Sequence, residues 1–320
     1  MTSRRSVLKA AIGVTALAGL TACAATGKDT VTRSDRTPPL GDLIQVDGKT
    51  VHVAEAGRGP AVVLLHGASG NLRDLTFDLT GYLNEAGFRT LAFDRPGLGY
   101  SDRLHDRGES PQEQARHLAK ALDARGVDRA IILGHSFGGS VAMAWALERP
   151  DQAAGVVTLG GATMPWPGGL GPWYSIASSD LGGATLVPLL VALVPRSRAP
   201  DFAQSLFNPD PLPTGYIDYV GVDLTLRPAQ VHTNARQVHG LKPHIQVMSQ
   251  KYPGLTLPVE ILHGTADKVV PETVHAIPMS RILPNGNLVL LEGRGHMPHH
   301  AEQEAVVAAV ARAARASGLR

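Results

Sequence analysis

A serine flanked by glycines has the spacing of a catalytic nucleophile. Residues 134–139 read GHSFGG and fit the pattern G-x-S-x-G, in which the serine stands on a sharp turn between a strand and a helix. An apolar run at 130–133 precedes this turn, and a helical stretch at 138–148 follows it. Glycine on each side lets the two backbones approach without Cβ clashes. This context favours a nucleophilic Ser136 over an incidental serine in a glycine-rich turn.

A second glycine-containing loop supplies candidates for binding a developing negative charge. Residues 66–70 read HGASG and follow the apolar run 61–65. An oxyanion hole needs two donors fixed toward the charge, and the backbone N–H groups of Ala68 and Phe137 are the natural pair. We expect His66 to brace this loop rather than to act as a base. The alternative interpretation of this segment is a plain glycine turn.

These segments, with three others, resemble the lidded α/β-hydrolase family. The others are the loop DRPGLGYSD at 94–102, GTAD at 264–267 and GH at 295–296, and the resemblance covers residues 40–318 in order and spacing. That family includes carboxylesterases, lactonases, C–C bond hydrolases, prolyl aminopeptidases, cofactor-free perhydrolases, epoxide hydrolases and haloalkane dehalogenases. The last two typically carry aspartate where this chain has Ser136, which argues against both. We expect Asp94 and Arg95 to brace loops near the site.

The resemblance implies a Ser-His-Asp triad with Asp267 as the acid and His296 as the base. A second place for the acid, after the run 155–159, reads GGAT at 160–163 and offers no carboxylate. His299 and His300 compete with His296, but we expect them to brace the loop or cap the final helix. No cysteine or acidic residue is spaced to complete a metal site with them, so neither a metal nor another cofactor is expected.

The pattern of elements predicts how these residues are positioned. Short β-rich runs alternate with helical stretches, which is typical of a mostly parallel sheet. We therefore expect an α/β-hydrolase fold: a mostly parallel eight-stranded sheet with helices on both faces and an inserted helical cap. The expected strands are 43–46 and 50–54, paired as a hairpin, then 61–65, 90–93, 130–133, 155–159, 259–263 and 287–291. The expected helices are 72–85, 111–124 with Ser110 as N-cap, 138–148 and 302–316.

The cap at 164–250 is expected to determine the substrate. It is rich in proline and glycine, contains Trp166 and Trp173, and has an apolar stretch at 181–194 that suits a lid helix or a membrane contact. Because residues 160–195 hold few charges, we expect a carboxylic ester or lactone of an apolar to moderately polar small molecule. A C–C bond hydrolase or perhydrolase using the same triad, or a non-enzymatic ligand sensor, are the alternatives.

The N-terminal residues resemble an export signal followed by a lipidation site. Arg4 and Arg5 resemble a twin-arginine signal, and the uncharged run 10–20 rises only about 16 Å as a helix, too little to cross a bilayer. The box LTAC at 20–23 contains Cys23, the one cysteine of the chain. We expect a signal peptide at 1–22, a lipidated N-terminus and flexible tether at 23–39, and the hydrolase domain at 40–320. The protein would then be exported and held at a membrane surface.

The charge of the chain argues against nucleic acid as a partner. The chain carries 30 basic and 28 acidic residues, a net charge of +2, and has no basic stripe of the kind that binds nucleic acid. A small-molecule substrate is therefore expected, and the sequence indicates no particular protein partner.

Overall fold

The computed structural model describes residues 37–320, so the expected signal segment, Cys23 and most of the tether lie outside the described residues. An eight-stranded sheet has the order β1-β2-β4-β3-β5-β6-β7-β8. Strand β2 is antiparallel to both of its neighbours, and all other pairs are parallel. The strands are β1 (Asp42–Val46), β2 (Lys49–Gly57), β3 (Ala61–Leu65), β4 (Arg89–Phe93), β5 (Ala130–His135), β6 (Ala153–Leu159), β7 (Val259–Gly264) and β8 (Gly286–Leu291). The expected fold class is confirmed.

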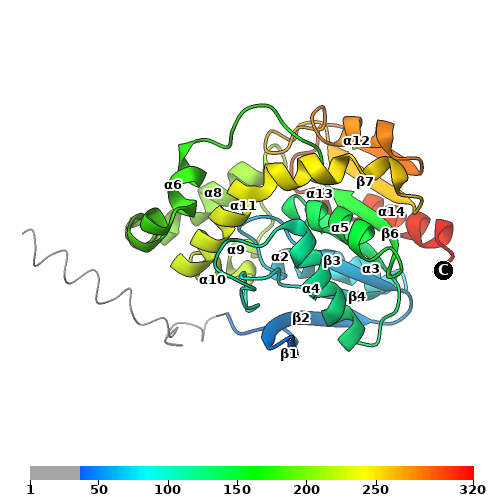
Figure 1. Ribbon diagram of the computed structural model, residues 1–320, viewed down its shortest axis with the longest axis horizontal. Coiled ribbons are helices and arrows are strands. Elements are labelled where there is room, and N and C mark those ends of the chain that lie inside the picture. The colour runs from blue at the N-terminus through cyan, green and yellow to red at the C-terminus, as the bar shows by residue number, and fades with distance from the viewer. Residues whose placement is uncertain (1–36) are drawn as a thin grey trace, which may run out of the picture. The chain divides into compact units, whose positions relative to one another are not determined.

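The central strands are apolar throughout because helices cover both faces of the sheet (Figure 1). Val63 and Leu65 of β3 face a core shared with α4 (Pro111–Ala124) and α5 (Phe137–Glu148). The alternate residues, Val62 and Leu64, face a second core shared with α3 (Leu79–Glu85) and α14 (Gln303–Ala316). This two-sided burial fixes the register of β3 and β5, and hence where the loops after them emerge.

The helices around the sheet follow from local signals, with one exception. Helix α4 begins at the expected N-cap, where the Ser110 hydroxyl accepts from the Glu113 N–H and the Glu113 carboxylate accepts from the Ser110 N–H. The single helix expected at 72–85 is wrong, because the structure has α2 (Arg73–Thr76) and then α3. Between them the Phe77 ring packs edge-on against Tyr216 and Tyr219 of the cap, and this tertiary contact outweighs the helical pattern.

A helical cap fills the chain between β6 and β7. Its main elements are α6 (Pro172–Ser178), the π-helix η2 (Gly182–Leu186), α7 (Val187–Leu193), the 3₁₀ turn η3 (Arg196–Arg198), α8 (Ala199–Phe207), α9 (Tyr216–Val220), α10 (Val222–Thr225) and α11 (Pro228–Ser249). In Figure 1 the shorter cap helices gather at one end of the molecule, and α11 runs from them to the sheet. The apolar stretch at 181–194 forms η2 and α7 rather than one α-helix. Gly183, in η2, lies against the His232 ring, so a Cβ at this position would clash with that ring.

No single helix within residues 37–320 is long and apolar enough to cross a membrane. Helices α6 and η2–α7 reach the required length and composition only as a pair, and the pair is bent by 90°.

Candidate active site

The nucleophile candidate stands at the junction of β5 and α5 in a strained backbone conformation. Ser136 has φ of +51° and ψ of −115°, and its N–H donates to the Leu159 carbonyl oxygen at 2.9 Å. A Cβ built on Gly138 would lie only 2.1 Å from the Leu65 carbonyl oxygen. The turn therefore requires glycine there, because β3 and the start of α5 nearly touch. This packing holds Ser136 above the carboxyl edge of the sheet.

The structure brings Asp267 and His296 together from the loops after β7 and β8. The His296 Nδ1 donates to Asp267 Oδ2 at 2.7 Å, and the N–H groups of Val269 and Val270 donate to Oδ1 at 2.8 and 2.9 Å. Burial acts to raise the pKa of Asp267, but hydrogen bonds from His263 and His296 outweigh it and hold that pKa below its ordinary value. Asp267 is therefore an ionised acceptor that fixes the His296 tautomer.

The alternative acid position is occupied by a glycine that packs on this pair. Gly160 has φ of +53°, and a Cβ built on it would lie 3.3 Å from both Asp267 Oδ2 and His296 Nδ1. The position after β6 therefore has no carboxylate, and the candidate acid comes from the loop after β7.

Ser136 and His296 line one cavity of about 620 Å³, together with Gly67 and Ala68. A Cβ built on Gly67 would lie 3.2 Å from Ser136 Cβ, so the loop that carries Ala68 lies directly against the serine. The cap closes the other side mainly with apolar side chains, among them Trp173, Leu190, Val191, Val194, Phe202, Leu206, Ile217 and Val220. The arrangement places a hydroxyl, an imidazole and a candidate oxyanion loop around one apolar chamber.

Comparison with known proteins places the chain in a family. Residues 60–303 match the family described as the alpha/beta hydrolase fold. The chain belongs to the α/β-hydrolase family. A match to 2-hydroxy-6-oxo-6-phenylhexa-2,4-dienoate hydrolase of Burkholderia cepacia has 33% identity over 123 residues, 38% of this chain and 41% of that protein. Haloalkane dehalogenase 2 of Mycobacterium bovis is 36% identical over 117 residues, 37% of this chain and 40% of that protein.

The chain thus spans about two fifths of the length of the curated relatives it matches. The solved structure of an esterase from Exiguobacterium antarcticum superposes with a TM-score of 0.69 at 20% identity, over 85% of this chain and 98% of that one. At that identity the likeness shows the fold.

In this α/β-hydrolase, Arg95 braces the loop that carries Ala68. The side chain is fully buried, and its Nε and Nη2 donate to the carbonyl oxygens of His66 and Gly67 at 2.9 and 3.0 Å. Its guanidinium lies over the Phe137 ring, 4.3 Å from the centroid. The His66 Nε2 in turn accepts from the Arg95 N–H at 3.0 Å. Arg95 therefore ties both segments of the candidate oxyanion hole together without lining the cavity.

The neighbouring histidines bind a residue that the sequence did not single out. The carboxylate of Asp74, on α2, accepts from His299 Nε2 at 3.2 Å, from His300 Nε2 at 3.1 Å and from the Tyr216 hydroxyl at 2.7 Å. His299 and His300 thus brace the loop beyond His296 rather than capping the final helix. Asp74 lies 225 positions before His299. The only signal of its role in the sequence is the adjacent pair His299 and His300, whose N–H groups need an acceptor when they are buried.

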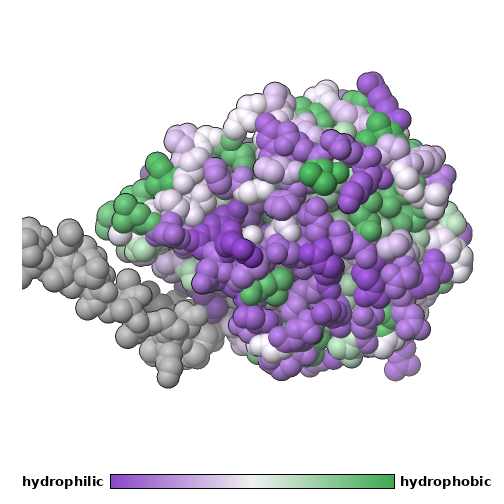
Figure 2. All heavy atoms as spheres, in the orientation of Figure 1, coloured by the Kyte–Doolittle hydropathy of each residue, from purple (hydrophilic) through white to green (hydrophobic). Residues whose placement is uncertain are grey.

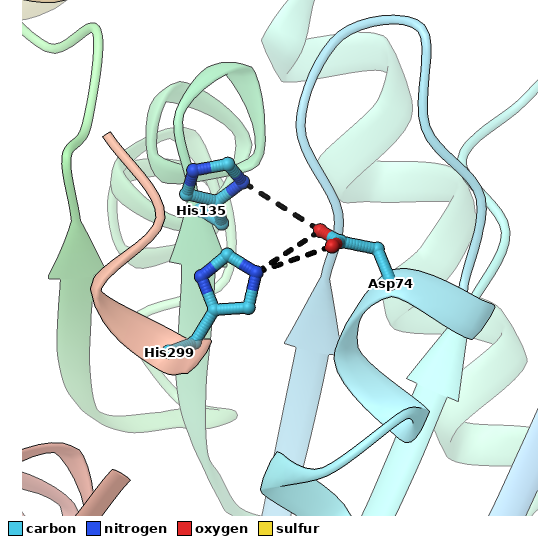
Figure 3. Close-up of side chains that lie close together, drawn as sticks. All are labelled: Asp74, His135 and His299. Atoms are coloured by element: carbon cyan, nitrogen blue, oxygen red, sulfur yellow. Dashed lines mark hydrogen bonds and ion pairs between the residues drawn. The ribbon is translucent and has the colours of Figure 1, made fainter. Parts of the chain in front are cut away.

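In the same cluster the Asp74 carboxylate faces the rings of both His135 and His299 (Figure 3). Burial opposes ionisation of Asp74, but the interactions with His299 and His300 hold its pKa well below the ordinary value. Burial, with His299 and His296 nearby, lowers the pKa of His135 well below its ordinary value, so its ring is neutral. Its Nε2 donates to the His296 carbonyl oxygen at 2.9 Å, which leaves Nδ1 as a lone pair 3.7 Å from Asp74 Oδ2.

Asp74, His135 and His299 bring an oxygen and two ring nitrogens within 4.8 Å of one another, and in the described part of the chain only these three do so. Such ligands suit a divalent metal such as Zn²⁺. However, protons from His299, His300 and Tyr216 already satisfy the Asp74 carboxylate. The cluster is therefore a hydrogen-bonded brace around Asp74, in which Nδ1 of His135 and Nδ1 of His299 have no hydrogen-bond partner.

Proposed function

We propose that this α/β-hydrolase is a serine esterase that cleaves a carboxylic ester or lactone of an apolar to moderately polar small molecule. The observation that carries the proposal is the strained turn at Ser136 in the same cavity as His296, whose Nδ1 is bound to Asp267 at 2.7 Å. This is the constellation of acyl transfer by a serine nucleophile.

The residues perform the reaction in two steps. His296 takes the Ser136 proton as the hydroxyl oxygen attacks the acyl carbon, and the N–H groups of Ala68 and Phe137 stabilise the oxyanion. The protonated His296 gives that proton to the leaving alcohol, which leaves an acyl-enzyme. Water, deprotonated by His296, then releases the acid and restores Ser136. Asp267 stabilises the imidazolium in both steps.

A C–C bond hydrolase is the second candidate, because the Burkholderia cepacia relative is named as a dienoate hydrolase. A dienoate carries a carboxylate. The only lysine or arginine that lines the cavity in residues 37–320 is Arg198, which is exposed and paired with Asp201 at 3.3 Å. The absence of a buried cation in this lining favours an uncharged ester over a dienoate.

Labelling and turnover test the proposal together. Fluorophosphonate is expected to label Ser136, and Ser136→Ala is expected to abolish turnover of p-nitrophenyl esters, because no other nucleophile lies at the turn. Ser280→Ala, on helix α12 (Ala276–Ile282), is the control, because the Ser280 hydroxyl donates only to a carbonyl of its own helix; this variant should keep the labelling and the turnover. Labelling at another residue, or unchanged turnover in Ser136→Ala, would overturn the assignment. A panel with dienoate substrates separates the two candidate reactions.

We also propose that the protein is exported and anchored through lipidated Cys23. The support is the Arg4-Arg5 pair, the short apolar run and the box at 20–23. Mass spectrometry of the isolated protein should find a lipid-modified Cys23 at the N-terminus, and Cys23→Ser should remain uncleaved or leave the membrane fraction. An intact Met1 in the wild type would rule this out.

A further inference from the structure

Large apolar side chains are exposed together on one part of the cap. Of the thirteen exposed large apolar residues in the described chain, eight lie between residues 170 and 202, and the other five are scattered. Leu181 is 75% exposed, Leu193 is 66% exposed and Leu189 is 53% exposed. Figure 2 shows hydrophobic residues gathered at the end of the molecule where Figure 1 draws α6. An apolar patch of this kind marks an interaction surface.

The cavity opens within this surface. Trp173, Val194 and Phe202 are exposed and also line the cavity that holds Ser136. Asp180 is the single charged residue between positions 160 and 195, and it is ion-paired with Arg236. Arg198, paired with Asp201 at 3.3 Å, is the one lysine or arginine of the described chain that lines the cavity. A ligand that approaches the mouth therefore meets mainly hydrocarbon.

The described chain begins beside residues that line the same cavity. The Thr37 carbonyl oxygen accepts from the Tyr100 hydroxyl, and the Thr37 side chain lies against Gly221, between α9 and α10. The residues on either side, Val220 and Val222, line the cavity. Thirteen residues, 24–36, separate Cys23 from Thr37. A chain of that length reaches at most about 50 Å, so a lipid on Cys23 would keep Thr37 within that distance of a bilayer.

We propose that the cap surface formed by Trp173, Leu181, Leu189, Leu193 and Phe202 inserts into the interface of a lipid bilayer, and that lipophilic esters enter the cavity from the membrane. The bilayer is the favoured occupant because Thr37, through which the segment that carries the proposed anchor joins the domain, lies beside residues that line the cavity. The chemistry rests on the proposed function. The docking surface and the membrane-dissolved substrate class go beyond it.

Tryptophan quenching tests the docking. The enzyme as isolated is mixed with phosphatidylcholine vesicles whose acyl chains carry bromine, which quenches tryptophan fluorescence only at close range. Trp145 is fully buried and Trp166 half-buried, so the difference between wild type and Trp173→Phe isolates the signal of the exposed Trp173. We expect quenching of Trp173 in the wild type. An unquenched Trp173 overturns the docking proposal.

A triple variant tests the substrate route. Leu181→Ser/Leu189→Ser/Leu193→Ser removes three apolar side chains that do not line the cavity, and Leu43→Ser/Leu290→Ser is the matched control far from the cap in sequence. We expect the triple variant to lose Trp173 quenching and about tenfold or more of its turnover of a long-chain ester in vesicles, because membrane insertion scales with buried apolar area. Turnover of a water-soluble short ester should stay unchanged, and the control should keep all three properties.

The outcomes separate the two proposals. Hydrolysis of the soluble ester with an unquenched Trp173 leaves the esterase proposal standing and removes the docking. Quenching of Trp173 without hydrolysis of any ester would support the docking proposal and overturn the esterase proposal. A dimer in sedimentation experiments that is dispersed by the triple variant would show that a second copy covers the surface, and would also overturn the docking proposal.

Discussion

The Asp267 carboxylate accepts from two backbone N–H groups and from His296, so its position is fixed before any substrate binds. Such a carboxylate selects the tautomer in which His296 Nδ1 carries the proton and Nε2 is free to accept the one from Ser136. The negative charge and the acceptor geometry are both required for this selection.

We therefore expect Asp267→Asn to retain the fold and lower kcat by about 10⁴-fold, because an amide donor facing Nδ1 traps the wrong tautomer. Steady-state kinetics and circular dichroism measure the two effects. Asp151→Asn, an exposed carboxylate paired with Arg149, is the control and should leave kcat unchanged. A loss in Asp267→Asn of less than tenfold would point to another acid.

Asp74 and Asp78 give a matched test of the histidine cluster. Asp74→Asn should lower the free energy of unfolding by about 3 kcal/mol, because it leaves the buried N–H donors of His299 and His300 facing an amide. Asp78 lies 3.5 Å from His300 Nδ1 at a partly exposed position, so Asp78→Asn should cost less than about 1 kcal/mol. Urea unfolding measures both. Equal losses in the two variants would contradict a special role for the buried carboxylate.

At the level of elements, the sequence predicts best where local and tertiary signals agree. The strand at 61–65 and the helix at 111–124 have the expected bounds, because an apolar run and a capping box respectively define them. Strand β5 extends to His135, two residues further than expected, because its last residues still pair with β6. The break between α2 and α3 and the role of Asp74 depend on contacts with the distant cap, which no local pattern reveals. The π-helix at 182–186 lies within the cap and packs against His232 of α11, a contact that the sequence does not reveal either.

The junction of β3 with α5 is expected to be intolerant of any side chain. Gly138→Ala should lower both stability and kcat, because its Cβ would lie 2.1 Å from the Leu65 carbonyl oxygen and force the serine turn away from the loop that carries Ala68. Gly81 on α3 has no atom within 4 Å of a built Cβ, so Gly81→Ala should be neutral or stabilise by about 0.5–1 kcal/mol. Thermal unfolding and ester turnover of the two variants check this. A fully active, fully stable Gly138→Ala enzyme would refute it.

For the whole molecule, buried histidines predict loss of stability in mild acid. Burial lowers the pKa of His66 and of His275 to about 4, from an ordinary value of 6.5. Unfolding lets each ring take up a proton below pH 6.5, so their contribution is intact above that pH and is lost as the pH falls toward 4. We expect the free energy of unfolding to drop by about 2 kcal/mol per histidine between pH 7.5 and 4.5.

Urea titrations at the two pH values measure this drop. His275→Asn is the control, since asparagine retains an acceptor for the Met164 N–H that His275 Nδ1 binds at 3.1 Å. That variant should show a shallower dependence on pH. A wild-type free energy of unfolding that stays constant from pH 7.5 to 4.5 would contradict the burial of neutral rings.

The backbone of Ser136 carries a cost in stability that glycine would avoid. A non-glycine residue at φ of +51° and ψ of −115° stores about 1–3 kcal/mol of strain, which glycine at the same position would relieve. Ser136→Gly should therefore unfold at higher urea than Ser136→Ala, while both are inactive. A protein that only binds a ligand would gain stability from glycine at this position. The proposed esterase accounts for the strain, because its reaction requires the hydroxyl of Ser136.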